Sequence, residues 1–549
     1  MARSTVVPLR RPAESGRRHP LHHFGSSFAS SPDRLGATSQ VSCFLLALLI
    51  CLSGPNVTNY DSYLAVPTAW SMLHEGNLNL DEYDAPLVRA HHGYRTVGAH
   101  QYDFYPWPVA LLALPVVGAV ALGEVIGLGP GPDRLIATNN MDGLQLVAAS
   151  LVVAATAMVM AMVAYERGHG RGRRRSGGLE RGHRDGSAPA PPTSSLQAVA
   201  VGVTLVTASA LWSTASRALW QHGPAALFLA LGLLYGQRLI AGGPGQPGTT
   251  TRHHLALGAS LSLAVVMRPT ALIGAMALAV AVTFAGVRAA RRSVSPIPVR
   301  ALGASVAGAA LVFVPFSLVN LATFSTLLPA SYSSNRLALH PAYAQALAAN
   351  LISPARGLLI FSPVLVVAGV DIALRQRRGE RPSLLSAACL VAVGAHWLVV
   401  SAGSFGWWAG HSYGARFFTE LTPLLAYPAL GLVERFCGAS RRWRGAVAVA
   451  LVASVAMQVP GVYLRVTNCW NTDPMDIDID PSRIWSWSNP PFLHALRAGA
   501  DGLAWRQVVL GPCPELAGRP VAAAVTLGSL RPGGHPSSER RSPPDRRRR

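Results

Sequence analysis

Long uninterrupted apolar runs are the feature that most restricts what this chain can fold into. Segments such as LVVAATAMVMAMVA and LALGASLSLAVVM show neither helical nor strand alternation, and several approach the roughly 20 residues that an α-helix needs to cross a bilayer. Half of the 549 residues are hydrophobic and only 13% are charged, whereas a soluble chain normally carries about 25% charge. We therefore predict an all-α, polytopic membrane protein.

The positive charges between the apolar runs set the predicted topology. Short loops rich in Arg stay on the cytoplasmic side, and Arg clusters occur in ERGHGRGRRRSGGLERGHRD, VRAARRSVSPIPVR, RQRRGERP and RFCGASRRWR. All four clusters lie on the cytoplasmic side if the run 107–128 lies in the membrane interface and does not cross the bilayer. The eleven predicted spans are then 41–54, 143–164, 196–212, 222–241, 255–267, 271–287, 301–323, 357–374, 384–401, 418–434 and 445–463.

This topology divides the chain into three parts. Residues 1–40 are rich in Arg, Pro, Ser and Gly, a composition that predicts a disordered N-terminus, here on the cytoplasmic side. Residues 41–463 form the transmembrane domain. Residues 464–549 form an extracytoplasmic tail that we expect to be disordered after about residue 515.

The first extracytoplasmic loop, 55–142, is long enough to predict a function. Residues 62–75 have apolar side chains at spacings of three and four, which predicts a short helix on the membrane surface. The spans 255–267 and 271–287 are short for a bilayer. They form either a tight hairpin with an outer turn at MRPT or a part-way crossing that leaves a groove open to lipid.

The first loop also contains an unusually acidic stretch, NYDSYLAVPTAWSMLHEGNLNLDEYD. It holds five of the 26 acidic residues of the chain. These are Asp61, Glu75, Asp81, Glu82 and Asp84. Because the outer segments also contain His, Trp, Tyr and Asn, whereas the inner loops contain mainly Arg, Gly and Pro, we expect the chemistry to be on the outer face.

The polar outer segments resemble those of a known family. An acid follows the first span in NYDSYLAVP, the first loop contains GNLNLDEY and YPWPVALLALP, and a short outer turn reads ASRALWQHGP. SPARGLLIFSP and GWWAGHSYGARFFTELTPLL introduce later spans. Over about residues 41–500 the chain resembles the GT-C membrane glycosyltransferases, especially the bacterial relatives of protein O-mannosyltransferases and aminoarabinose transferases in glycosyltransferase family 39.

The resemblance implies a fold, a reaction and a location. The fold is a GT-C-like bundle with surface helices in its first outer loop. The reaction is inverting transfer of a sugar from a polyprenyl-phosphate donor to a lipid, glycan or protein hydroxyl. The location is the outer face of the bacterial inner membrane.

An inverting transfer needs a carboxylate that deprotonates the acceptor hydroxyl, and a positioned base contributes about 10²- to 10⁴-fold. Asp61 fits this role best because it lies close to the first span, and the resemblance implies the same position. Asp81 and Glu82 are the alternatives. If these acids have no catalytic role, Asp61 is a solvated residue in an Asx turn, and Asp81 and Glu82 are an exposed acidic pair.

The leaving phosphate needs positive charge near the interface, which Arg supplies through bidentate hydrogen bonds. Arg side chains at span ends can also reach lipid headgroups without any other role. Histidine and tyrosine in WQHGP and GHSYGAR can bind a sugar or a phosphate. The candidate substrate-binding residues are Arg217, His222, Arg268, Arg356, His411, Tyr413 and Arg416.

The C-terminal tail contains two further candidate features. The segment DPMDIDIDP places Asp476, Asp478 and Asp480 on one face if it is extended, and oxygen ligands of this kind suit a divalent metal such as Ca²⁺. No EF-hand glycine or distal Glu is present, so no cofactor is assigned. Cys469 and Cys513 can form a disulfide if the tail is extracytoplasmic.

Two other functional classes fit the composition. A lipid-linked glycan flippase or transporter would place charges near the membrane midplane and show internal repeats. A non-catalytic membrane subunit of an envelope-assembly system needs no active site. The net charge of +21 comes from Arg, which we attribute to the codon bias of a GC-rich genome, so no nucleic-acid partner is predicted.

Overall fold

The computed structural model of the protein describes most of the chain. The described residues are 34–58, 61–83, 86–89, 91–176, 193–241, 247–292, 299–329, 331–332, 339–403, 406–436, 438–500 and 502–511. The predicted all-α character is confirmed, because the described chain is mostly helical and its only sheet is one two-stranded hairpin. Most of the predicted N-terminal segment, and the tail beyond 511, lie outside the described residues.

Six described helices are long and apolar enough to cross a bilayer, which indicates a membrane protein. Several carry large apolar side chains that are exposed on the outside of the bundle, for example Phe284 at 52% and Leu311 at 68%. Such surfaces are stable against lipid and not against water. The six helices are α6 (Asp142–Ser176), α8 (His222–Ala241), α10 (Leu272–Arg292), α11 (Val299–Phe324), α15 (Leu384–Ser401) and α17 (Arg441–Tyr463).

The other five predicted spans also contain helices, but a count of eleven transmembrane helices is not confirmed. Four of these helices have between 13 and 16 residues. They are α1 (Ala37–Leu52), α7 (Ser195–Thr207), α14 (Val364–Arg377) and α16 (Thr422–Arg435). The fifth, α9 (Pro247–Met267), has 21 residues but begins with the polar sequence PGTTTRHH.

The expectation that 255–267 and 271–287 form short helices is wrong. Helices α9 and α10 each have 21 residues, because both continue through polar and Arg-containing residues at their ends away from the MRPT turn. The 3₁₀ turn η3 (Pro269–Ala271) joins them at that turn.

Helix α9 packs closely on α11 through small residues. A Cβ atom on Gly258 would lie 1.8 Å from the Ser305 carbonyl oxygen, and one on Gly308 would lie 2.1 Å from the Leu255 carbonyl oxygen. Both positions therefore require glycine, as is common where membrane helices cross.

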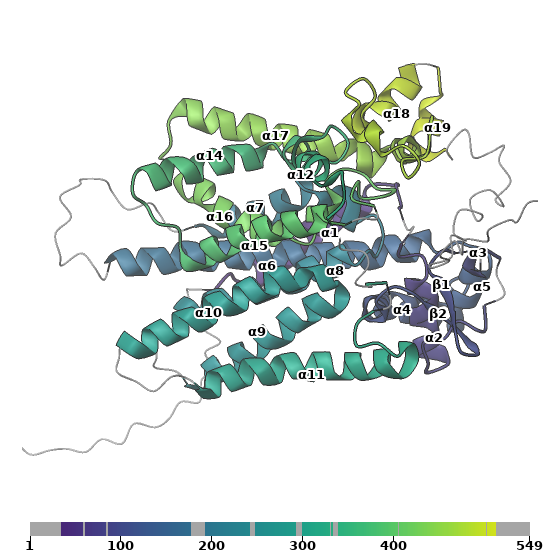
Figure 1. Cartoon of the computed structure of the whole chain (residues 1–549), viewed down its shortest axis with the longest axis horizontal. Coiled ribbons are helices and arrows are strands. Elements are labelled where there is room, and N and C mark those ends of the chain that lie inside the picture. The colour runs from purple at the N-terminus through teal and green to yellow at the C-terminus, as the bar shows by residue number, and fades with distance from the viewer. Residues whose placement is uncertain are drawn as a thin grey trace, which may run out of the picture.

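The helices are arranged so that Arg-rich ends lie on one side of the molecule (Figure 1). The C-terminal ends of α6, α10 and α14 and the N-terminal end of α17 lie at the left of the view, and each of these ends carries Arg. The elements of the first loop and of the C-terminal segment lie at the right end. This separation agrees with the charge distribution on which the predicted topology depends.

The first loop folds into short elements at the right end of the bundle. They are α2 (Ala65–His74), α3 (Pro86–Arg89), β1 (Tyr94–Val97), β2 (His100–Asp103), η1 (Trp107–Leu112), α4 (Leu114–Val125) and α5 (Pro132–Ala137). The helix predicted within 62–75 is present as α2, and its residues Ala65–Ser71 are buried against the protein. The run 107–128 is divided between η1 and the 12-residue α4, which is too short to cross a bilayer.

The hairpin brings the end of β2 to the bundle. Strands β1 and β2 are antiparallel, and their register pairs Tyr94 with Asp103 and Val97 with His100. Gly98 occupies the turn with a φ of 63°, a conformation that glycine adopts without strain. Asp103 therefore lies where the strand ends and the chain enters η1.

The remaining described elements are short. They are η2 (Leu211–Ala215), α12 (Tyr343–Ile352), α13 (Leu358–Phe361), η5 (Arg416–Phe418), η6 (Arg465–Asn471), η7 (Pro481–Trp485), α18 (Pro491–Ala500) and α19 (Trp505–Leu510). Cys469 in η6 is disulfide-bonded. Its predicted partner, Cys513, lies outside the described residues.

Candidate functional site

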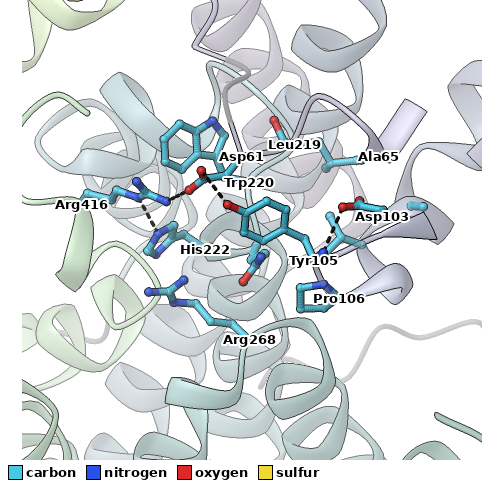
Figure 2. Close-up of a pocket in the computed structure, with 14 residues that line it drawn as sticks. Asp61, Ala65, Asp103, Tyr105, Pro106, Leu219, Trp220, His222, Arg268 and Arg416 are labelled. Carbon is cyan, nitrogen blue, oxygen red and sulfur yellow. Dashed lines mark hydrogen bonds and ion pairs between the residues drawn. The ribbon is translucent and has the colours of Figure 1, made fainter. Parts of the chain in front are cut away.

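A pocket lies where the first loop meets the bundle. It combines the N-terminal side of α2, the chain after β2, the start of α8, the α9–η3 junction and the start of η5. Figure 2 shows ten of its residues labelled. The lining residues are Asp61, Ser62, Ala65, Asp103, Tyr105, Pro106, Val109, Ala110, Leu219, Trp220, Gln221, His222, Arg268 and Arg416.

Asp61 accepts three polar contacts in this pocket. Arg416 Nη2 donates to its Oδ2, and the Tyr105 hydroxyl donates to its Oδ1 at 3.1 Å. His92 Nε2 lies 3.4 Å from the same Oδ1 atom. Burial alone would raise the pKa of Asp61, but Arg416 and His92 outweigh burial and hold this pKa well below its usual range. Asp61 is therefore a carboxylate paired with a cation.

Arg416 is held on several sides. Its Nε donates to His222 Nε2 at 3.1 Å, and its guanidinium carbon lies 3.9 Å from the centre of the Trp220 ring. Its Nη1 donates to the Ala409 carbonyl at 3.4 Å. Because a guanidinium only donates, His222 Nε2 must carry the lone pair and His222 Nδ1 the proton. The arrangement fixes the direction in which Arg416 faces the pocket.

Glu420 connects His222 and Arg268 behind the lining of the pocket. Its Oε2 lies 2.6 Å from His222 Nδ1, and its Oε1 accepts from Arg268 Nε at 2.7 Å and from the Thr270 hydroxyl at 2.9 Å. His396 Nε2 lies 3.6 Å from Oε1. The Glu420 side chain has no exposed surface, so these donors must stabilise its charge.

Arg268 extends the cluster toward a second wall of the pocket. Its Nη1 donates to the Tyr332 hydroxyl at 3.3 Å, and that hydroxyl donates to Gln221 Oε1 at 3.0 Å. The chain of contacts from Asp61 through Arg416, His222 and Glu420 to Arg268 therefore places two guanidinium groups on one side of the pocket.

Asp103 is the second acid in the pocket and differs from Asp61. Its Oδ1 accepts from the Tyr105 backbone N–H at 3.0 Å, and no Arg contacts it among the described residues. Burial raises the pKa of Asp103 to about 7, the Tyr105 N–H opposes this rise, and the charge of Asp61 adds to it. Near neutral pH the pocket therefore holds one ionised and one partly protonated carboxyl group.

The structure brings together four of the candidate residues that the sequence predicted. Asp61, His222, Arg268 and Arg416 all line the pocket. Arg217 and Arg356 lie elsewhere and are 0% and 1% exposed. Arg217 donates to the carbonyls of Cys51 and Gly54, and Arg356 donates to those of Trp408 and Gly410. These two guanidinium groups connect loops and do not face the pocket.

The other two predicted binding residues also lie outside the pocket. The Tyr413 hydroxyl donates to the Met457 carbonyl at 2.7 Å. His411 Nε2 lies 2.9 Å from Asp476 Oδ1 and 3.6 Å from Asp478 Oδ2. One nitrogen and two carboxylate oxygens within 4.8 Å of one another could hold a divalent metal. Asp480, the third predicted ligand, accepts from the Ser482 N–H instead.

The alternative acids of the first loop lie away from Asp61. Asp81 is exposed, lies next to His100 and accepts from the Gln101 N–H at 2.7 Å. Glu82 accepts from the Ser71 hydroxyl and lines a separate, open pocket with Glu75 and Asp133. Asp84 lies outside the described residues.

Glu420 is the main site residue that the sequence reasoning missed. It lies inside the predicted apolar span 418–434, where TEL precedes a long apolar run. An acidic residue inside a predicted span indicates a functional site or a buried ion pair, so the signal was present. Nothing in the sequence indicated the roles of Tyr105 or His92, because their contacts depend on the fold of the first loop.

Comparisons of the chain with protein-family models, with curated proteins and with solved structures find no match.

Proposed function

We propose that the protein is an integral membrane glycosyltransferase that uses a polyprenyl-phosphate sugar. The observation that supports this proposal best is the pairing of the Asp61 carboxylate with Arg416 in a pocket that also holds Arg268. A carboxylate beside two guanidinium groups has the components that an inverting sugar transfer needs: a base for the acceptor and cations for the leaving phosphate.

The proposed reaction assigns each group a role. The acceptor oxygen attacks the anomeric carbon and passes its proton to Asp61. The bond between this carbon and the phosphate oxygen breaks on the opposite face, and the electron pair leaves with the polyprenyl phosphate. Arg416 and Arg268 stabilise the charge that develops on the phosphate.

The ion pair between Asp61 and Arg416 explains how the base becomes active only with donor present. A carboxylate whose pKa is held far below its usual range is a weak base. A donor phosphate that engages Arg416 competes with Asp61 for the same guanidinium, so Asp61 loses its strongest stabilising partner. Its pKa then rises toward that of a useful base.

The location follows from the charge distribution. The pocket is lined in part by first-loop residues, and the elements of the first loop lie at the end of the bundle opposite the Arg-rich helix ends (Figure 1). If those ends are cytoplasmic, the pocket opens on the outer face of a bacterial inner membrane, where a lipid-linked donor presents its sugar. The acceptor is then a hydroxyl of a lipid, a glycan or a protein on that face.

The test is transfer of labelled sugar in membranes that contain the protein. Polyprenyl-phosphate sugars with radiolabelled mannose, glucose or galactose are incubated with these membranes and with matched membranes that lack the protein. We expect protein-dependent label in an acceptor fraction. Movement of the labelled donor across vesicles with no new glycosidic bond would instead indicate a flippase.

A further inference from the structure

Two buried polar side chains that line the pocket have few or no partners among the described residues. Asp103 is 7% exposed, and its Oδ1 accepts a hydrogen bond from the Tyr105 N–H. Ser62 is 4% exposed, and its Oγ has no partner among the described residues. Buried polar atoms are normally hydrogen-bonded. Atoms of this kind that line a pocket are suited to bind a ligand.

Asp103 lies away from the cationic side of the pocket. Figure 2 shows Arg416, His222 and Arg268 on one side of Asp61 and Tyr105, and Asp103 on the other side. Pro106, Val109 and Leu219 also line the pocket and supply apolar surface. A ligand that fills both sides has an anionic group at one end and a neutral part with hydroxyl and C–H groups at the other.

We propose that Asp103 and Ser62 form a subsite that binds the hydroxyl groups of a sugar whose phosphate lies at Arg416. The inference rests on the proposed function, because that function supplies the phosphate-linked sugar. Ser62 and Asp103 would each form a hydrogen bond to a sugar hydroxyl. Both residues are positioned by elements that also carry Asp61 and Tyr105, so the sugar is held next to the base.

The protonation of Asp103 makes this subsite sensitive to pH. The groups that face Asp103 are Asp61, Tyr105 and, across the hairpin, Tyr94. Below pH 7 the Asp103 carboxyl carries a proton and can both donate and accept. Above pH 7 it loses this donor and repels the ligand phosphate. Sugar affinity therefore falls as the pH rises through about 7.

The experiment compares two soluble probes on the purified full-length protein. Inorganic phosphate reports the cationic side alone, and hexose 1-phosphates (mannose, glucose and galactose) report both sides. Isothermal titration calorimetry at pH 6 and pH 8 gives the dissociation constants. We expect the best hexose 1-phosphate to bind at least about tenfold more tightly than phosphate at pH 6, since each of the two added hydrogen bonds contributes roughly fivefold.

Three variants separate the subsite from general damage. Ser62→Ala and Asp103→Leu should each weaken the hexose 1-phosphate roughly fivefold without changing phosphate binding. Asp103→Asn keeps a donor and an acceptor, so it should bind as the wild type does at pH 6 and lose the additional weakening at pH 8. Glu124→Gln, an exposed acid in the same loop, is the matched control and should change nothing.

Each other outcome overturns the inference. Equal affinities for phosphate and all three hexose 1-phosphates would exclude a sugar subsite at Asp103, and so would variants that weaken both probes equally. If phosphate binds and the sugar contributes nothing, the proposed function survives and the subsite does not. If the wild type binds neither probe, the phosphate pocket of the proposed function fails, and the inference fails with it.

Discussion

Glu420 offers the sharpest test of the buried charge cluster. Glu420→Gln preserves the size of the side chain and removes its negative charge. Arg268, which lies 2.7 Å from Glu420 and is 8% exposed, then keeps a buried charge without its carboxylate. Breaking a buried ion pair by removing one partner costs about 3–5 kcal/mol. His222 also loses the acceptor for its Nδ1 proton.

The assay is thermal melting of the purified protein in detergent. A cost of this size should lower the melting temperature by about 3–4 °C in a chain of this length. Glu380→Gln, an exposed acid between α14 and α15, is the matched control and should change stability by less than about 0.5 kcal/mol. The double variant Glu420→Gln/Arg268→Gln should recover part of the loss, because it leaves no unpaired buried charge.

Two results would contradict this description of the cluster, one for the single variant and one for the double variant. If Glu420→Gln melts with the wild type, the carboxylate does not stabilise Arg268 and His222, and the cluster is described wrongly. If the double variant is less stable than Glu420→Gln by the full cost of a second, independent site, the two residues do not interact.

Three further predictions follow from the site and the topology. Arg416→Lys loses bidentate geometry and stacking on Trp220, so the KM for the donor should rise about tenfold; an unchanged donor KM would remove Arg416 from phosphate binding. Between about pH 4 and pH 7 the folded protein retains an Asp103 proton that the unfolded chain has released, so stability falls with pH across this window. Asp103→Asn should therefore melt higher than the wild type at pH 8 and equally at pH 4, and melting curves that do not differ at pH 8 would contradict this reasoning. A reporter fused after residue 175, at the Arg-rich end of α6, should be active only in the cytoplasm, and an extracytoplasmic reporter would invert the topology.

The presence of helices was predictable from the sequence, whereas the number of helices that cross the membrane was not. All eleven apolar runs contain helix, because a long apolar run can satisfy its backbone hydrogen bonds in a bilayer only in this way. The lengths of α9 and α10 were missed because only apolar residues were counted, whereas both helices extend through polar ends. The hairpin of the first loop was also missed, because its strands have only four residues each.

The candidate site was predictable in part. Asp61, His222, Arg268 and Arg416 are polar residues next to predicted spans, and the ends of packed spans meet on one side of the molecule. Which of these residues touch depends on loop conformations that no local pattern encodes. Arg217 and Arg356 had the same sequence signature as Arg268 and Arg416, yet their guanidinium groups bind backbone carbonyls.

The structure reduces the number of acidic residues in this stretch that are candidates for the base. Only Asp61 of its described acids reaches the cationic pocket, whereas Asp81 and Glu82 have other partners. This difference makes the choice of base testable with a pair of matched variants.

The most direct measurement is the turnover of Asp61→Asn and Asp81→Asn in the membrane assay with a labelled polyprenyl-phosphate sugar. The account predicts that Asp61→Asn reduces turnover by about 10²-fold or more and that Asp81→Asn retains wild-type turnover. Wild-type turnover in Asp61→Asn, with loss of activity in Asp81→Asn, would contradict it.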